Sequence, residues 1–289
     1  MRRVEFKNRI GLTIVGNMFF PEDFDDTKHY PAIVFGHPAA STKELTSGKY
    51  AEALSKAGYV TMAYDATCQG ESEGRPRHLE DPSSRVEDIR AAIDYFTTLP
   101  FVDHSRMAAA GVCAGAAYAI KAAQTDKRIR AVAGVSPSDI GQIFRRGWTG
   151  DQPIEEVYKL LDQLAAERTA EACGAPLRYT GWMPTEGQQP EYNEDNAPVD
   201  AFPFISFDRI LEFTAFDHVD TLLTQPVLYV IGEEAFTRWV GEDAYNRSME
   251  PKELHLVKGA GHVDLYLTEP YFSEVAARMT TFFDKYLKA

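Results

Sequence analysis

The fold of this chain is decided by one stretch, Gly111-Val112-Cys113-Ala114-Gly115. A short apolar run, residues 107–110, precedes it, and a helix-forming run of small residues, 114–123, follows it. A strand, a Gly-x-nucleophile-x-Gly turn and a helix form a nucleophile elbow, whose tight turn exposes the central side chain at the top of a sheet. The central residue is Cys113, and the positive field at a helix N-terminus favours its reactive thiolate. The alternative interpretation is a small, inert cysteine buried between strand and helix.

Strands and helices alternate on both sides of this elbow. The alternation predicts crossover connections and a mostly parallel, doubly wound α/β sheet. Residues 4–20 alternate apolar and polar side chains, which predicts an antiparallel hairpin at a sheet edge. The expected strands lie in 31–38, 59–65, 107–110, 129–135, 226–232 and 254–259, and the expected helices in 44–57, 81–100, 114–123, 153–173, 238–247 and 270–287.

The regular alternation stops after the strand at 129–135. Residues 140–207 hold one amphipathic helix and then a loop-rich tract with many Pro, Gly and aromatic residues. We expect this segment to be a lid inserted into an α/β core formed by 1–139 and 208–289, because a loop this long in a compact protein is usually functional. Its aromatic residues either contact the substrate or only pack the lid onto the body. The weak candidates for substrate contact are Trp148, Tyr179 and Trp182.

Composition narrows the class of protein. The chain has 289 residues, 44% of them hydrophobic and 25% charged, which is ordinary for a soluble globular protein. A formal charge of −13 argues against nucleic acid or a membrane surface as a partner. The three cysteines follow no disulfide or zinc spacing, and no signal peptide or transmembrane run is evident, so we expect a cytoplasmic protein without metal or other cofactor. A homodimer is left open.

His262 is the candidate general base. It lies in the loop after the last expected strand, at the carboxyl end of the sheet, toward which the elbow also points. An elbow after an inner strand and a His after the last strand follow the α/β-hydrolase plan. In that plan the oxyanion hole uses the N–H of the residue after the nucleophile, Ala114, and an N–H from the loop at residues 37–40. Pro38 has no N–H, so Ala39 or Ala40 is the second donor.

The acid that would orient His262 has more than one candidate position in the sequence. Its usual place is the loop after the strand that ends at Gly232, but that loop offers only Glu233 and Glu234. The fold also accepts an acid after the preceding strand, where Asp139 stands. We favour Asp139 over Glu233 and Glu234 by a narrow margin.

These stretches resemble a cysteine-elbow branch of the α/β hydrolases, which includes fungal polyketide transferases and thiohydrolases and their bacterial relatives. The resemblance is carried by 36–38, 63–72, 111–115, 122–128 and 259–266, and it covers little of the lid. It implies acyl chemistry on a thioester or ester through Cys113 and His262. One departure is Phe236, where such relatives often have Asp, and this weakens that loop as the home of the acid.

Three functions are compatible with these observations. The first is acyl transfer, in which Cys113 takes an acyl group from a polyketide-type thioester, delivered by a carrier protein or CoA, and passes it to an alcohol, forming an ester or lactone, or to water. The second is a general carboxylesterase or lactonase of the same fold. The third is a binding protein that has lost its chemistry. Relative rates on thioesters and aryl esters separate the first two, and acylation of Cys113 excludes the third.

Overall fold

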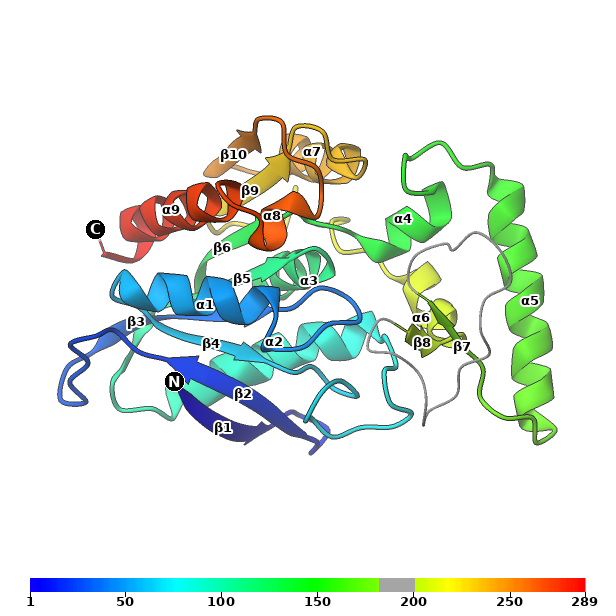
Figure 1. The fold of residues 1–289 in the computed structure, drawn as a ribbon, viewed down its shortest axis with the longest axis horizontal. Coiled ribbons are helices and arrows are strands. Elements are labelled where there is room, and N and C mark those ends of the chain that lie inside the picture. The colour runs from blue at the N-terminus through cyan, green and yellow to red at the C-terminus, as the bar shows by residue number, and fades with distance from the viewer. Residues whose placement is uncertain (182–200, 289) are drawn as a thin grey trace.

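The computed structural model describes residues 1–181 and 201–288. Within them, eight strands form one sheet (Figure 1) in the order β1-β2-β4-β3-β5-β6-β9-β10. The β1–β2 and β2–β4 pairs are antiparallel and every other pair is parallel, which confirms the mostly parallel sheet with a hairpin at its edge. The strands are β1 (Arg2–Lys7), β2 (Thr13–Phe19), β3 (Tyr30–Gly36), β4 (Val60–Tyr64), β5 (Val102–Val112), β6 (Ile129–Val135), β9 (Val227–Gly232) and β10 (Lys252–Val257).

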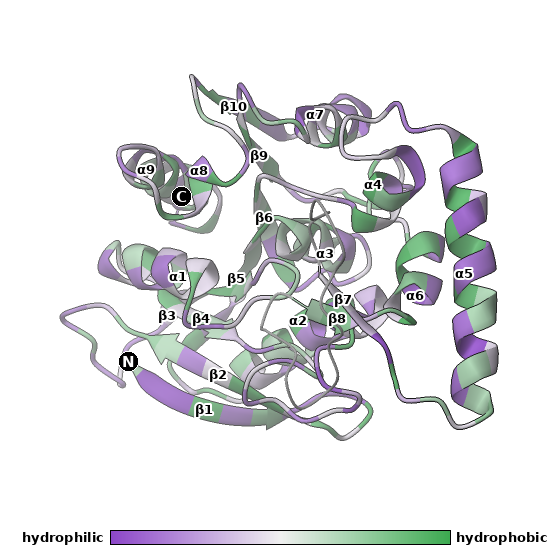
Figure 2. Cartoon of the chain, turned by 45° about the vertical axis from the view of Figure 1, so that its right-hand side comes forward, coloured by the Kyte–Doolittle hydropathy of each residue, from purple (hydrophilic) through white to green (hydrophobic). Residues whose placement is uncertain are grey.

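Helices cover both faces of this sheet. Figure 2 shows α1 and α9 together on one face and α2 and α3 on the other, as a doubly wound sheet requires. The Asp81 side chain caps α2, accepting from the N–H of Ser83 at 3.0 Å, and Pro82 occupies the first helical turn. The helices of the core are α1 (Thr46–Lys56), α2 (Pro82–Thr97), α3 (Ala114–Ala123), α7 (Arg238–Arg247), α8 (Asp264–Leu267), α9 (Tyr271–Phe283) and a final π-helical turn, η1 (Asp284–Lys288).

The central strands are buried on both faces, and small side chains let the helices approach them. Residues 107–112 of β5 and the helix α3 are almost entirely buried, and most of them are Ala or Gly. The elbow therefore lies at the middle of the core, on a strand flanked by β3 and β6.

The predicted lid segment lies beyond one end of the sheet (Figure 1). It contains α4 (Ile140–Arg146), α5 (Ile154–Ala172), β7 (Tyr179–Gly181), β8 (Ala201–Pro203) and the start of α6 (Ser206–Glu212). The helix α5 is mostly exposed and buries only Val157 and Leu164, at helical spacing. The division into a core and a lid stays a prediction. In the described ranges, no helix is long and apolar enough to span a membrane.

Candidate active site

The elbow has the strand–turn–helix geometry that its sequence predicts. Cys113 lies between β5 and α3 with a backbone φ of 55°, a left-handed conformation that is strained for a non-glycine residue. Gly111 and Gly115 make this turn fit, since a Cβ at Gly111 would overlap the Gly115 carbonyl and one at Gly115 would overlap the Gly36 carbonyl. The two glycines thus bring the loop after β3 directly against the elbow.

The Cys113 thiol is held by three side chains. It is 7% exposed, and the side chains of His262, Tyr266 and Ser138 lie beside its sulfur, to which each can donate a hydrogen bond. Burial alone would raise the pKa of this thiol, but the charge of His262 and these hydrogen bonds outweigh burial and lower the pKa to about 7. A substantial share of Cys113 is therefore thiolate at neutral pH.

His262 contacts the thiol from the loop after β10. Its ring is 5% exposed, and Tyr266, one turn later on α8, places its hydroxyl 3.1 Å from His262 Nε2. Phe236 stacks on the other side of the imidazole with ring centroids 5.5 Å apart. The Ser136 hydroxyl donates to the His262 carbonyl at 3.0 Å, so the loop after β6 also fixes the loop of the base.

The residue at the second imidazole nitrogen is a threonine. Thr237 Oγ1 lies 2.5 Å from His262 Nδ1, and Thr237 is 3% exposed at the start of α7. Enzymes of this chemistry usually place a carboxylate there, which orients the ring and stabilises the imidazolium. A hydroxyl orients the ring equally well but adds no negative charge.

Asp139, the predicted acid, has no hydrogen bond to His262 among the described residues. Asp139 is the N-cap of α4, and its carboxylate oxygens accept from the N–H of Gln142 at 3.0 Å and the N–H of Ala215 at 2.7 Å. The carboxylate therefore joins α4 to the segment after α6, and Thr237, not Asp139, is hydrogen-bonded to His262. Asp139 follows β6, whereas Thr237 follows β9, and the sequence could not show that backbone donors contact both oxygens of Asp139.

Neither glutamate of the loop after β9 takes this place. Glu233 accepts from the N–H of Gly259 at 3.3 Å, and Glu234 is exposed. In the part of the chain that the structure describes, neither side chain is hydrogen-bonded to His262.

The proposed oxyanion donors remain available. Among the described residues, none accepts a hydrogen bond from the N–H of Ala39, Ala40 or Ala114. Ala40 has a φ of 47°, so the loop turns sharply at this point. An oxyanion hole requires N–H donors that are not already engaged, so the assignment of these residues stays a prediction.

A network of buried polar side chains holds the loop at residues 37–40, which we call the oxyanion loop after its predicted role. His37 Nε2 accepts from the N–H of Ala66 at 3.1 Å, and its Nδ1 lies 2.7 Å from the Pro38 carbonyl. Arg85 donates to the His37 carbonyl at 2.6 Å and pairs with Glu80 at 3.0 Å, and both charged side chains are at most 2% exposed. Burial and the neighbouring Arg85 lower the pKa of His37 well below its usual range, so His37 is a neutral structural residue.

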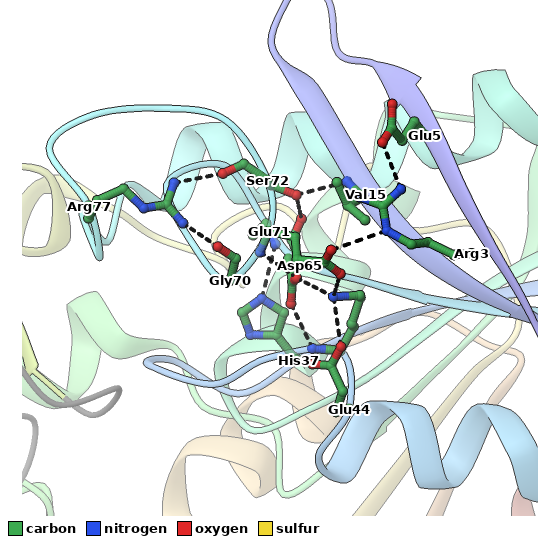
Figure 3. Close-up of polar contacts among 12 residues, drawn as sticks. Arg3, Glu5, Val15, His37, Glu44, Asp65, Gly70, Glu71, Ser72 and Arg77 are labelled. Carbon is green, nitrogen blue, oxygen red and sulfur yellow. Dashed lines mark hydrogen bonds and ion pairs between the residues drawn. The ribbon is translucent and has the colours of Figure 1, made fainter.

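Three acidic groups in the described ranges could hold a metal ion by their spacing. Figure 3 shows Glu44, Asp65 and Glu71 converging, with their nearest oxygens within 4.8 Å of one another. The ammonium group of Lys43 occupies their centre, 2.6 Å from Asp65 and Glu71 and 2.7 Å from Glu44. The protein supplies its own cation here, and Asp65 thereby joins the loop after β3 to the loop after β4.

The three lid aromatics have different surroundings. Trp148 meets Phe236 edge to face at 5.6 Å, so an aromatic chain leads from the lid segment to the His262 ring. Tyr179 is 3% exposed and donates to the Arg77 carbonyl at 2.8 Å, so its hydroxyl is engaged with a loop of the core. Trp182 lies outside the described residues.

Sequence reasoning missed three residues of the site. Ser138, Thr237 and Tyr266 contact the thiol or the imidazole, but each is a common residue type in a loop or short helix. One local signal pointed toward Tyr266, which follows His262 by four residues, one helical turn.

Fold and site together define a class of protein. The profile described as "Alpha/beta hydrolase family" matches residues 33–277, and the chain belongs to this family. The crystal structure of the hypothetical protein PA2218 from Pseudomonas aeruginosa superposes with a TM-score of 0.89 at 30% identity, covering 99% of this chain and 93% of that one. Uncharacterized protein YcjY of Escherichia coli is 37% identical over 99% of both chains.

Fungal relatives confirm the resemblance seen in the sequence. Acyltransferase drtE of Aspergillus calidoustus is 26% identical, covering 99% of this chain and 95% of the relative. Others at 23–26% identity are named a thiohydrolase and polyketide transferases.

Proposed function

We propose that this protein is an acyl-transfer enzyme that works through a thioester on Cys113. The observation that carries the proposal is the position of Cys113 on the strained turn between β5 and α3, beside His262, whose charge lowers the pKa of the thiol to about 7. A buried cysteine that only packed strand against helix would have a raised pKa and no base beside it.

The first half-reaction follows from the positions of these groups. The Cys113 thiolate attacks the carbonyl carbon of a thioester, and the oxyanion that forms accepts from the N–H of Ala114 and of Ala39 or Ala40. When the intermediate collapses, the bond to the leaving sulfur breaks, and His262 gives that thiolate the proton taken from Cys113. One thioester is exchanged for another, so this step is close to thermoneutral.

In the second half-reaction an alcohol or water attacks the acyl-Cys113 carbonyl. His262 removes the proton from the attacking oxygen, the bond to Sγ breaks, and Cys113 is regenerated. An alcohol yields an ester, or a lactone when it belongs to the acyl chain itself, and water yields the free acid. The fungal relatives named acyltransferase, polyketide transferase and thiohydrolase support a polyketide-type acyl group. Its delivery by CoA or a carrier protein is part of this proposal.

The test is intact-protein mass spectrometry after mixing with an octanoyl N-acetylcysteamine thioester. We expect one octanoyl group on Cys113 in the wild type and none in Cys113→Ala. Steady-state rates on this thioester and on p-nitrophenyl octanoate then separate thioester acyl transfer from general esterase activity. Failure to acylate Cys113 with either substrate would contradict the proposal.

A further inference from the structure

Tyr266 reaches both reacting atoms of the site. Its hydroxyl lies 3.1 Å from His262 Nε2 and beside the Cys113 sulfur, to which it can donate a hydrogen bond. Burial and the nearby thiolate raise the pKa of Tyr266 well above its usual range, so the hydroxyl stays protonated. It carries a single proton and can therefore donate to only one of the two atoms at a time.

The position of this hydroxyl is fixed by α8. Leu265 is fully buried, and its carbonyl accepts from the Tyr50 hydroxyl at 2.5 Å, which ties α8 to α1. Asp264 accepts from the N–H of Gly261 at 2.7 Å and closes the turn that contains His262. Tyr266 thus has little freedom to leave the site.

The preferred acceptor of the Tyr266 proton changes during the proposed reaction. Before acylation, the thiolate carries the negative charge and is the stronger acceptor. After acylation, Sγ belongs to a neutral thioester and accepts poorly. His262 is then neutral, with its Nδ1 proton donated to Thr237 and a free lone pair on Nε2, 3.1 Å from the hydroxyl.

We propose that the Tyr266 hydroxyl stabilises the Cys113 thiolate before acylation and occupies His262 Nε2 afterwards, which protects the acyl-enzyme from hydrolysis. This inference rests on the proposed function. The nitrogen that Tyr266 occupies is the base that an attacking water needs, so water must first displace the hydroxyl. An acyl-enzyme that hydrolyses slowly persists until an acceptor alcohol is bound.

The test compares Tyr266→Phe with the wild type in single turnovers with the octanoyl N-acetylcysteamine thioester. The variant keeps the ring and loses only the hydroxyl. We expect acylation to slow and hydrolysis of acyl-Cys113 to accelerate, each by roughly threefold to tenfold, the effect of one hydrogen bond. Opposite signs in the two half-reactions are the signature, because a structural defect slows both.

The matched control is Tyr229→Phe, which removes a buried hydroxyl that is hydrogen-bonded with Ser248 and takes no part in holding α8 or in contacting Sγ or Nε2. We expect it to leave the acyl-enzyme lifetime unchanged. A second readout needs no acyl substrate: the pH midpoint of Cys113 alkylation by iodoacetamide rises in Tyr266→Phe. Acyl-Cys113 of equal lifetime in wild type and Tyr266→Phe would overturn this inference alone, whereas a wild type that never acylates would overturn the proposed function and the inference with it.

Discussion

Thr237 Oγ1 lies 2.5 Å from His262 Nδ1 and takes the place of the triad acid. The proposed reaction can work with this neutral partner because the charge of His262 lowers the pKa of the Cys113 thiol to about 7. A serine at the elbow would need a stronger base. We therefore infer that a threonine can replace the carboxylate at His262 Nδ1 because the residue at the elbow is a cysteine.

Thr237→Val removes the hydroxyl while keeping the shape of the side chain. We expect kcat/KM on the octanoyl thioester to fall roughly threefold to tenfold, the effect of one neutral hydrogen bond. Thr237→Asp introduces a carboxylate that stabilises the imidazolium facing the thiolate, so we expect the Cys113 thiol to titrate below pH 7. Thr237→Asn serves as the uncharged control. Equal alkylation profiles for the Asp and Asn variants would show that Thr237 does not communicate with the thiol.

The pH dependence of Cys113 alkylation follows from its lowered pKa of about 7. Below this pH the thiol is protonated and reacts slowly, and above it the rate reaches a plateau. Removing the His262 ring leaves burial to dominate, so His262→Ala should move the midpoint upward by more than one pH unit. Peptide-resolved mass spectrometry is the measurement, because the exposed Cys173 also reacts. A midpoint that does not move would show that His262 does not stabilise the thiolate.

Asp139→Asn tests whether this residue caps α4 or acts as the acid of the site. An asparagine keeps one acceptor oxygen but faces the second of the two backbone N–H groups with an NH₂, so we expect a loss of about 1–3 kcal/mol in the free energy of unfolding. We expect the alkylation midpoint of Cys113 in the folded variant to stay unchanged. An alkylation midpoint shifted as strongly as in His262→Ala would restore Asp139 as the acid.

Most of the fold was predictable because it depends on local patterns. Apolar runs and helical spacing indicated the strands and helices, and the helix at 238–247 agrees with the structure at both ends. The elbow was predictable because close contacts between backbone atoms require glycine at positions 111 and 115. These contacts lie within the turn itself and with the backbone at Gly36.

The site was predictable only where position in the fold fixes the residue. His262 follows the last strand, so the topology places it near the elbow. The partner of His262 Nδ1 depends instead on the path of the loop between β9 and α7. No recognised sequence motif predicts that path. Asp139 was favoured as the acid because it follows the neighbouring strand β6. Tyr266 was not predicted for a similar reason: no motif distinguishes a tyrosine that contacts the site from one that only packs in the core.

The buried Arg85–Glu80 ion pair links the stability of the fold to the position of the loop at residues 37–40. Both side chains are almost fully buried, Tyr118 donates to Glu80 at 2.6 Å, and Arg85 holds the His37 carbonyl of the oxyanion loop. Arg85→Met leaves the Glu80 carboxylate buried without its cation, so we expect a loss of about 3–5 kcal/mol in the free energy of unfolding, measured by urea titration. Arg85→Met combined with Glu80→Gln removes the unpaired charge and should recover part of this loss. The oxyanion loop loses its anchor in both variants, so acylation should stay slow in the double variant even where stability returns. A double variant with wild-type acylation would show that this network stabilises the fold without positioning the oxyanion hole.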